Sequence, residues 1–328
     1  MSRSAVIVGT GHAVPRRVMT NDDLAKIVDT NDEWIAQRTG IRERRVCDPD
    51  ETTTTLSIEA AQKALQAAKV DPAEVQMVIC GTVTPDMPFP AAASIVQDAI
   101  GAKNAGAFDL GAACAGFIYS LSTASAMIKA GDINTALVVG VDTLTKFVDW
   151  TDRSTCVLFG DGAGAVVVRA SEDPQRGVIK TVMLSDGAGA GYITLEAGGS
   201  KHPYSQGGFD NCRTSIFMAG AEVYRFAVTA MGDACCRLLE ECNLEPSAID
   251  LFVPHQANLR IIDSAAKRLA LPSEKVFVNV DRYGNTSGGS IPIALDEAVQ
   301  QGRLKPGMLV MTVGFGAGLV WGANLIRW

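Results

Sequence analysis

The sequence predicts a layered α/β protein built from two similar halves, and three observations support this. Apolar runs of strand length alternate with amphipathic runs of helix length along the 328 residues. Most expected strands are apolar on both faces, as strands between two layers of helices are. Several stretches also recur after about 170 residues, which indicates an internal duplication.

The first half supplies strands and helices in alternation. Thr20 or Asn21 is suited to cap a helix within 20–41, where Leu24, Ile27 and Val28 have helical spacing. An Asp-Pro pair at 71–72 ends the next helix. The expected strands are 5–11, 75–83, 108–110, 134–143 and 159–170, and the other expected helices are 56–70, 91–101 and the stretch that follows residue 112.

The second half repeats this order. KVDPAEVQMVICGT (69–82) aligns with NLEPSAIDLFVPHQ 174 residues later, FDLGAACAGF (108–117) with VNVDRYGNTSGG at about 171, and TALVVGV (135–141) with GMLVMTV at 172. We therefore expect halves at 1–171 and 172–328, related by a pseudo-twofold axis. The turn after 108–110 should then face the turns after strands at 249–254 and 276–281.

Composition excludes several classes of protein. Hydrophobic residues make up 47% and the net charge is −7, without a Lys/Arg-rich block, so we expect no nucleic-acid partner. Such an acidic protein could bind an acidic partner only through a local basic patch. Met1 leads directly into a strand pattern without a signal peptide, which predicts a cytoplasmic protein. The eight cysteines form no CxxC pair, which is typical of reduced thiols rather than disulfides or a zinc site.

The stretch from Leu110 to Ile128 is uncharged but rich in Gly, Ala, Ser and Thr. This composition favours a buried helix over a membrane span. Cys114 falls at or near the first turn of that helix, where unpaired N–H groups and the helix dipole would stabilise a thiolate. Taken alone, an inert buried cysteine is the more common case.

Two further polar residues follow the duplicated strands. His255, one of only three histidines, comes directly after the strand ending near 253, and Asn285 lies at the position that we align with Cys114. Each has an ordinary explanation, as a core histidine and as a turn or capping asparagine. Their convergence with Cys114 on one axis is harder to explain by chance. GFGAG (314–318) could be a plain hairpin or could direct N–H groups at an oxyanion.

Several motifs occur in order along the whole chain. With them the chain resembles β-ketoacyl-acyl-carrier-protein synthase III, the condensing enzyme of the thiolase superfamily that starts fatty-acid synthesis. The motifs are DTNDEWIAQRTGIRERR (29–45), AACAGF (112–117), TDR (151–153) with LFGDGAGAV (158–166), PHQANLRII (254–262), YGNTSGGSIP (283–292) and GFGAGLVWGA (314–323).

The resemblance implies a thiolase-like fold, in which two βαβαβαββ halves form an α-β-α-β-α sandwich. It implies Cys114 as nucleophile with His255 and Asn285 completing a triad, and an oxyanion hole formed by the N–H groups of Cys114 and Ala317, where the family usually has glycine. It further implies coenzyme A contacts at Trp34, Arg38, Arg153, Asn258 and Gly220, and an acyl pocket with Phe89, contributed across a homodimer, and Phe315. A patch for acyl carrier protein would consist of Arg225, Arg260, Lys267 and Arg268. Without the resemblance, Trp34 would be read as a core residue and the basic side chains as solvated.

The chemistry explains why these residue types are required. A thiolate attacks a thioester and also leaves easily, and donors from His255 and Asn285 would stabilise the enolate formed when malonyl thioester loses carbon dioxide. The substrates would be an acyl-CoA and malonyl-acyl-carrier protein. We expect no metal, redox cofactor or membrane partner.

Two departures concern acyl preference. Gly288 and Gly289 stand where the family more often has alanine, which could loosen the helix start or admit a larger group. The polar segment 197–211, which contains His202, is expected to form a surface flap.

Four alternatives stay open. An ordinary thiolase would need a second cysteine near GFGAG, which has none. A relative in secondary metabolism could use a different acceptor. A Cys-His-Asn thioester hydrolase and a non-catalytic coenzyme A-binding protein are the remaining two.

Overall fold

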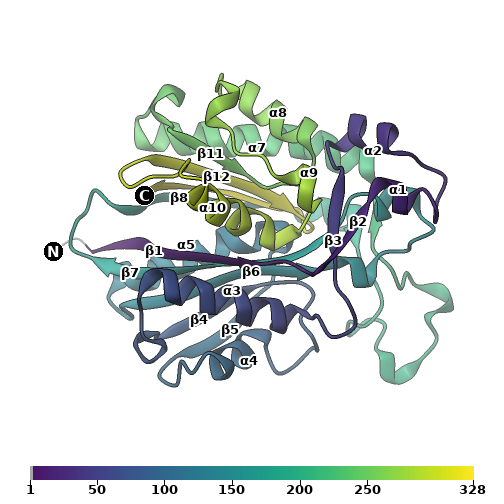
Figure 1. Cartoon of the computed structure of the whole chain (residues 1–328), viewed down its shortest axis with the longest axis horizontal. Helices are drawn as coiled ribbons and strands as arrows, with labels where there is room; N and C mark the ends of the chain where they lie inside the picture. The colour runs from purple at the N-terminus through teal and green to yellow at the C-terminus, as the bar shows by residue number, and fades with distance from the viewer. Residues whose placement is uncertain (1–2) are drawn as a thin grey trace.

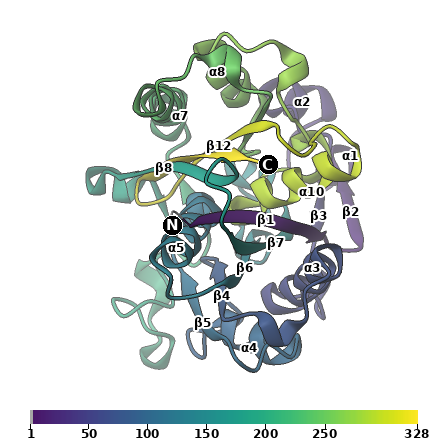
Figure 2. The same cartoon turned by 90° about the vertical axis from the view of Figure 1, so that its left-hand side faces the viewer.

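The structure is a computed structural model that describes residues 3–328 (Figure 1). Two central sheets are separated by one layer of helices and covered by another layer on each outer face (Figure 2). Apolar clusters fill each of the spaces between layers. The predicted α-β-α-β-α sandwich is confirmed.

The first sheet contains only elements of the first half. Its strand order is β1-β7-β6-β4-β5, with parallel pairing of β4 to β5 and β6 and antiparallel pairing of β7 to β1 and β6. The strands are β1 (Ser4–Ala13), β4 (Met77–Gly81), β5 (Gly106–Leu110), β6 (Thr135–Thr143) and β7 (Asp161–Ser171).

The second sheet repeats this arrangement with one strand fewer. Its order is β11-β12-β13-β8, for β8 (Gly177–Ser185), β11 (Leu251–Pro254), β12 (Leu309–Gly316) and β13 (Val320–Arg327). The counterpart of β5 is reduced to one bridge between Phe252 and Val276, so the strand expected at 276–281 does not form. Since β7 and β8 belong to different sheets, the boundary after residue 171 lies between the sheets, although it stays a prediction as a domain boundary.

Helices occupy the layers in matching pairs. In the middle, α5 (Gly116–Ala130) and α10 (Ser290–Gln300) contact both sheets. The outer layers are α3 (Thr53–Ala68) with α4 (Ala92–Ala99), and α7 (Gly220–Cys242) with α8 (Leu259–Arg268).

The smaller elements gather beside the entrance to the site. The helix expected within 20–41 is instead two short helices, α1 (Asn21–Leu24), capped by Thr20, and α2 (Asp32–Thr39), capped by Asn31. The helix stops after Leu24 because the next apolar residue, Ile27, is 49% exposed and finds no core to pack against. The other small elements are β2 (Arg17–Thr20), β3 (Glu43–Val46), α6 (Arg153–Cys156), β9 (Ile193–Thr194), β10 (Phe217–Met218) and α9 (Val280–Tyr283).

The duplication holds at one spacing throughout. β4 and β11, α5 and α10, and β6 and β12 each begin 174 residues apart. The alignments at 171 and 172 were therefore wrong by two or three residues, and the structural counterpart of Cys114 is Gly288, not Asn285. Backbone geometry repeats as well, because Ala113 (φ 44°) and Ser287 (φ 50°) are both left-handed.

Among residues 3–328, no helix is long and apolar enough to cross a membrane.

Candidate active site

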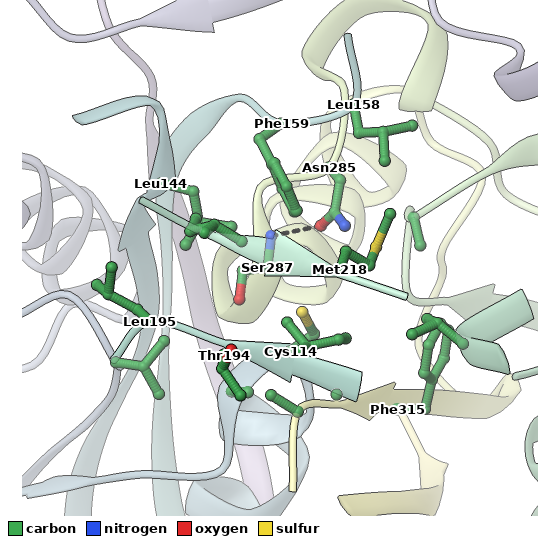
Figure 3. A pocket seen from close by; sticks show the side chains of 18 of the residues that line it. Cys114, Leu144, Leu158, Phe159, Thr194, Leu195, Met218, Asn285, Ser287 and Phe315 are labelled. Carbon is green, nitrogen blue, oxygen red and sulfur yellow. Dashed lines mark hydrogen bonds between the residues drawn. The ribbon is translucent and has the colours of Figure 1, made fainter. Parts of the chain in front are cut away.

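Turns from both halves enclose one deep cavity of about 480 Å³. Cys114, His255 and Asn285 all line it, so the structure brings the three predicted polar side chains together. Figure 3 shows Cys114 and Asn285 directed toward the same space. The convergence follows from the duplication, which places the ends of β4, β5, β11 and β12 around one axis.

Cys114 lies in a 3₁₀ turn, Ala113–Ala115, that leads directly into α5. The turn is tight because Ala113 adopts a left-handed conformation. It is also packed closely, since a Cβ added to Gly316 would lie 2.6 Å from the Cys114 nitrogen. Only glycine at 316 lets the β12 hairpin approach the nucleophile's backbone so closely.

The protonation state of Cys114 differs from the expectation. Burial raises the pKa of the thiol to about 12, with a smaller contribution from the nearby Asp142 carboxylate. Asp142 is fully buried and accepts hydrogen bonds from Thr82, Val83, Thr84 and the Gly288 N–H. In the empty site, loss of water therefore outweighs the helix N-terminus.

His255 follows β11 and is completely buried. Its Nδ1 lies 2.6 Å from the Ser290 Oγ, and its Nε2 has no partner among the described residues. The ring packs edge to face with Phe315 at 5.8 Å between centroids. Burial lowers the pKa of the imidazole to about 3, so His255 is neutral near pH 7.

Asn285 is fixed by the strand segment that precedes β7. Its backbone exchanges hydrogen bonds with Leu158 and Gly160, at 2.9 and 3.0 Å. Its Oδ1 accepts the Ser287 N–H at 2.8 Å, the dashed line in Figure 3. The side-chain oxygen thus forms the ordinary turn contact, which leaves the NH₂ group as the donor available to a ligand.

The glycine-rich turn joins β12 to β13 as a tight hairpin. Ala317 in this turn lines the cavity together with Gly316. Its backbone therefore reaches the site despite the Cβ.

The residues expected to bind coenzyme A divide into two groups. Trp34, Arg38 and Arg153 meet at the surface, where the guanidinium carbons lie 4.3 Å (Arg38) and 4.8 Å (Arg153) from the indole centroid. Asn258 and Gly220 line the cavity. Asn258 joins the groups, because its Nδ2 donates to the Arg38 carbonyl at 3.0 Å.

The two predicted acyl-pocket residues lie apart. Phe315 lines the cavity, whereas Phe89 is 84% exposed and does not line it in this single chain. The apolar wall was missed, because the sequence assigned these side chains to a core, a motif or a loop. This wall, part of which is labelled in Figure 3, comprises Leu144, Phe147, Leu158, Phe159, Ile193, Leu195, Ile216 and Met218.

The predicted basic patch lies on the outer helices α7 and α8. All four side chains are exposed. Arg225 pairs with Glu222 at 3.0 Å and Arg268 with Asp233 at 3.4 Å, while Lys267 has no ion pair among the residues described.

The two departures have different outcomes. A Cβ on Gly288 would lie 2.9 Å from the Gly81 oxygen, and one on Gly289 2.3 Å from the Gly162 oxygen. These glycines therefore make close packing possible and provide no extra room, so the expected loosening was wrong. Segment 197–211 is largely exposed and forms the predicted flap, the teal-green loop in Figure 1.

Comparisons with known proteins agree on one family. Residues 108–200 match the family described as 3-oxoacyl-[acyl-carrier-protein] synthase III, and residues 239–328 match its C-terminal family. The chain is 49% identical to a β-ketoacyl-[acyl-carrier-protein] synthase III of Caldanaerobacter subterraneus, over 99% of this chain and 98% of that protein. The corresponding protein of Symbiobacterium thermophilum is 51% identical, over 99% and 98%.

Solved structures give the same result. The 3-oxoacyl-[acyl-carrier-protein] synthase III of Aquifex aeolicus superimposes with a TM-score of 0.92 at 46% identity, covering 99% of this chain and all of that one. A priming β-ketosynthase from the R1128 polyketide pathway superimposes with a TM-score of 0.91 at 37% identity, covering 99% and 96%.

Proposed function

The chain belongs to the β-ketoacyl-acyl-carrier-protein synthase III family, and from this premise we propose that Cys114, His255 and Asn285 carry out its condensation. It is an acyltransferase of fatty-acid synthesis that joins an acyl-CoA primer to malonyl-acyl-carrier protein. The products are 3-ketoacyl-acyl-carrier protein, coenzyme A and carbon dioxide.

In the first half-reaction, the Cys114 sulfur attacks the primer's thioester carbonyl. The N–H groups of Cys114 and Ala317 hold the oxyanion. The carbon–sulfur bond to coenzyme A then breaks, and the thiol proton ends on the coenzyme A sulfur. Trp34, Arg38 and Arg153 hold the nucleotide end, which their cluster at the cavity's outer side supports.

In the second half-reaction, malonyl thioester loses carbon dioxide and its bonding electrons form an enolate. His255 Nε2 and the Asn285 NH₂ group donate hydrogen bonds to the enolate oxygen. The enolate carbon attacks the acyl-cysteine, and the released thiolate takes up one proton. The partnerless Nε2 in the cavity is the single observation that most supports this step.

Acyl loading tests the nucleophile. Incubation of Cys114→Ala with acetyl-CoA should give no increase in mass, whereas the wild-type chain should gain one acetyl group. Cys212→Ala, which removes a partly exposed loop thiol, is the control and should load normally. Continued condensation by Cys114→Ala would refute the assignment.

The donors are tested by separating the two half-reactions. His255→Ala should lower decarboxylation about 10²–10³-fold, the loss typical of one oxyanion donor, while loading falls much less. Equal loss of both half-reactions would contradict the assigned role. Release of free acetate by the wild-type chain would instead indicate a hydrolase.

A second function has one specific observation in its favour. The R1128 priming β-ketosynthase has nearly the same fold at 37% identity, so priming of a secondary-metabolite pathway is the alternative. Loading rates over a series of acyl-CoA primers distinguish an acetyl preference from a longer one.

We also propose that the chain is a cytoplasmic homodimer in which Phe89 closes the partner's acyl pocket. The exposure of this phenylalanine together with Met87 supports the proposal, because large apolar side chains on one loop favour an interface. Sedimentation of the wild-type chain and of Phe89→Asp measures the dimer.

A further inference from the structure

Ser290 contacts the nitrogen of His255 that faces away from the partnerless Nε2. It is the first residue of α10 and only 2% exposed. Its Oγ lies 2.6 Å from His255 Nδ1 and 3.4 Å from the Gln256 backbone nitrogen. These two contacts are its only hydrogen bonds within residues 3–328.

The two contacts fix the direction of the hydrogen bond to His255. A backbone N–H can only donate, so the Ser290 oxygen accepts from Gln256. The single hydroxyl proton is then available for Nδ1, which must act as the acceptor. A neutral imidazole has one proton, and with Nδ1 accepting, this proton is on Nε2.

We propose that Ser290 is a positioning residue that holds His255 in the Nε2–H tautomer, so that the neutral ring donates to the enolate oxygen. This inference rests on the proposed function. With the opposite tautomer, the Nε2 lone pair would face the enolate oxygen and repel it. The edge-to-face Phe315 ring packs against the imidazole and restrains its rotation.

Burial makes this selection necessary. Since the pKa of His255 is lowered to about 3, an imidazolium that could donate from both nitrogens is absent near pH 7. The partner of Nδ1 therefore decides whether the ring donates toward the substrate or accepts from it.

Kinetics of two variants test the proposal. Ser290→Ala should lower decarboxylation of malonyl-carrier protein about 10–100-fold, with loading of Cys114 changed less than about threefold. Ser290→Thr retains the hydroxyl and should keep most of the decarboxylation activity. Ser57→Ala, which removes another fully buried helical hydroxyl, is the matched control and should leave both rates unchanged. Unchanged decarboxylation in Ser290→Ala, or equal loss of both half-reactions, would overturn the proposal.

Nitrogen NMR tests the tautomer directly and does not depend on whether Ser290→Ala folds. The chain has three histidines, so ¹⁵N-histidine spectra are simple, and His255→Gln identifies the His255 signals. We expect protonated-type Nε2 and unprotonated-type Nδ1 in the wild type and in Ser290→Thr, and a mixed population in Ser290→Ala. A wild-type proton on Nδ1 refutes the inference. A wild-type chain that neither loads nor condenses refutes the proposed function instead.

Discussion

Burial sets the protonation states of the two reacting side chains. It raises the pKa of Cys114 and lowers the pKa of His255, and both shifts favour the neutral form. The empty site therefore holds a thiol and a neutral imidazole rather than an ion pair. Charge in this site develops only when a substrate oxygen reaches the N–H donors.

The His255 shift has a consequence for stability. Its pKa is about 3 in the folded chain and about 6.5 when unfolded, so below pH 6.5 only the unfolded state takes up this proton. Stability is thus lost as pH falls through 6.5. Between pH 7 and pH 5, wild type should lose about 2 kcal/mol more free energy of unfolding than His255→Gln. Urea unfolding at both pH values measures this difference, and His202→Gln in the flap should behave as wild type does.

At the scale of elements, glycines let the turns of the two halves touch. A Cβ on Gly140 in β6 would lie 2.1 Å from the Gly288 oxygen, and one on Gly289 would be almost as close to Gly162. Backbone meets backbone here, so the contact cannot relax by moving a flexible side chain. This packing holds the Cys114 and Asn285 turns in a fixed relation.

Gly289→Ala should therefore lower the free energy of unfolding by about 1–3 kcal/mol, the range for overpacked cores. Condensation should fall as well, because the displaced turn carries Asn285. Thermal unfolding and the condensation rate check both effects. Gly191→Ala adds the same methyl group where no atom lies within 4 Å, and it should change neither quantity.

The order of elements could be predicted from sequence, because buried strands and capped helices are local patterns. The convergence of Cys114, His255 and Asn285 also followed, since a duplication brings equivalent turns together. The alignment of the halves was less accurate, because few letters are shared and geometry alone identifies Gly288 as the counterpart of Cys114. The Ser290 contact and the raised pKa of Cys114 depend on tertiary packing, which no local pattern encodes.

At the scale of the molecule, an acidic chain must bind an acidic carrier protein. The net charge of −7 opposes that encounter, and exposed cations on α7 and α8 oppose the net charge locally. Arg225 and Arg268 are partly neutralised by carboxylates, so we expect Lys267 to contribute most.

Lys267→Glu should raise KM for malonyl-carrier protein about tenfold at low salt and less at high salt, because screening weakens steering. Loading from acyl-CoA should not change. Steady-state kinetics at two ionic strengths measure both parameters. Lys103→Glu makes the same charge change in the first half, after α4, and a similar rise in that variant would show that net charge rather than the patch is responsible.

The paired left-handed residues Ala113 and Ser287 carry a consequence for the protein's ancestry. An ancestral single-copy protein that paired with itself would have presented the same bend twice across its symmetry axis. Fusion of the copies allowed a division of labour, in which one bend kept the sulfur and its twin lost every reactive atom and became scaffold. The asymmetry of the present enzyme is thus a specialisation of two formerly identical corners.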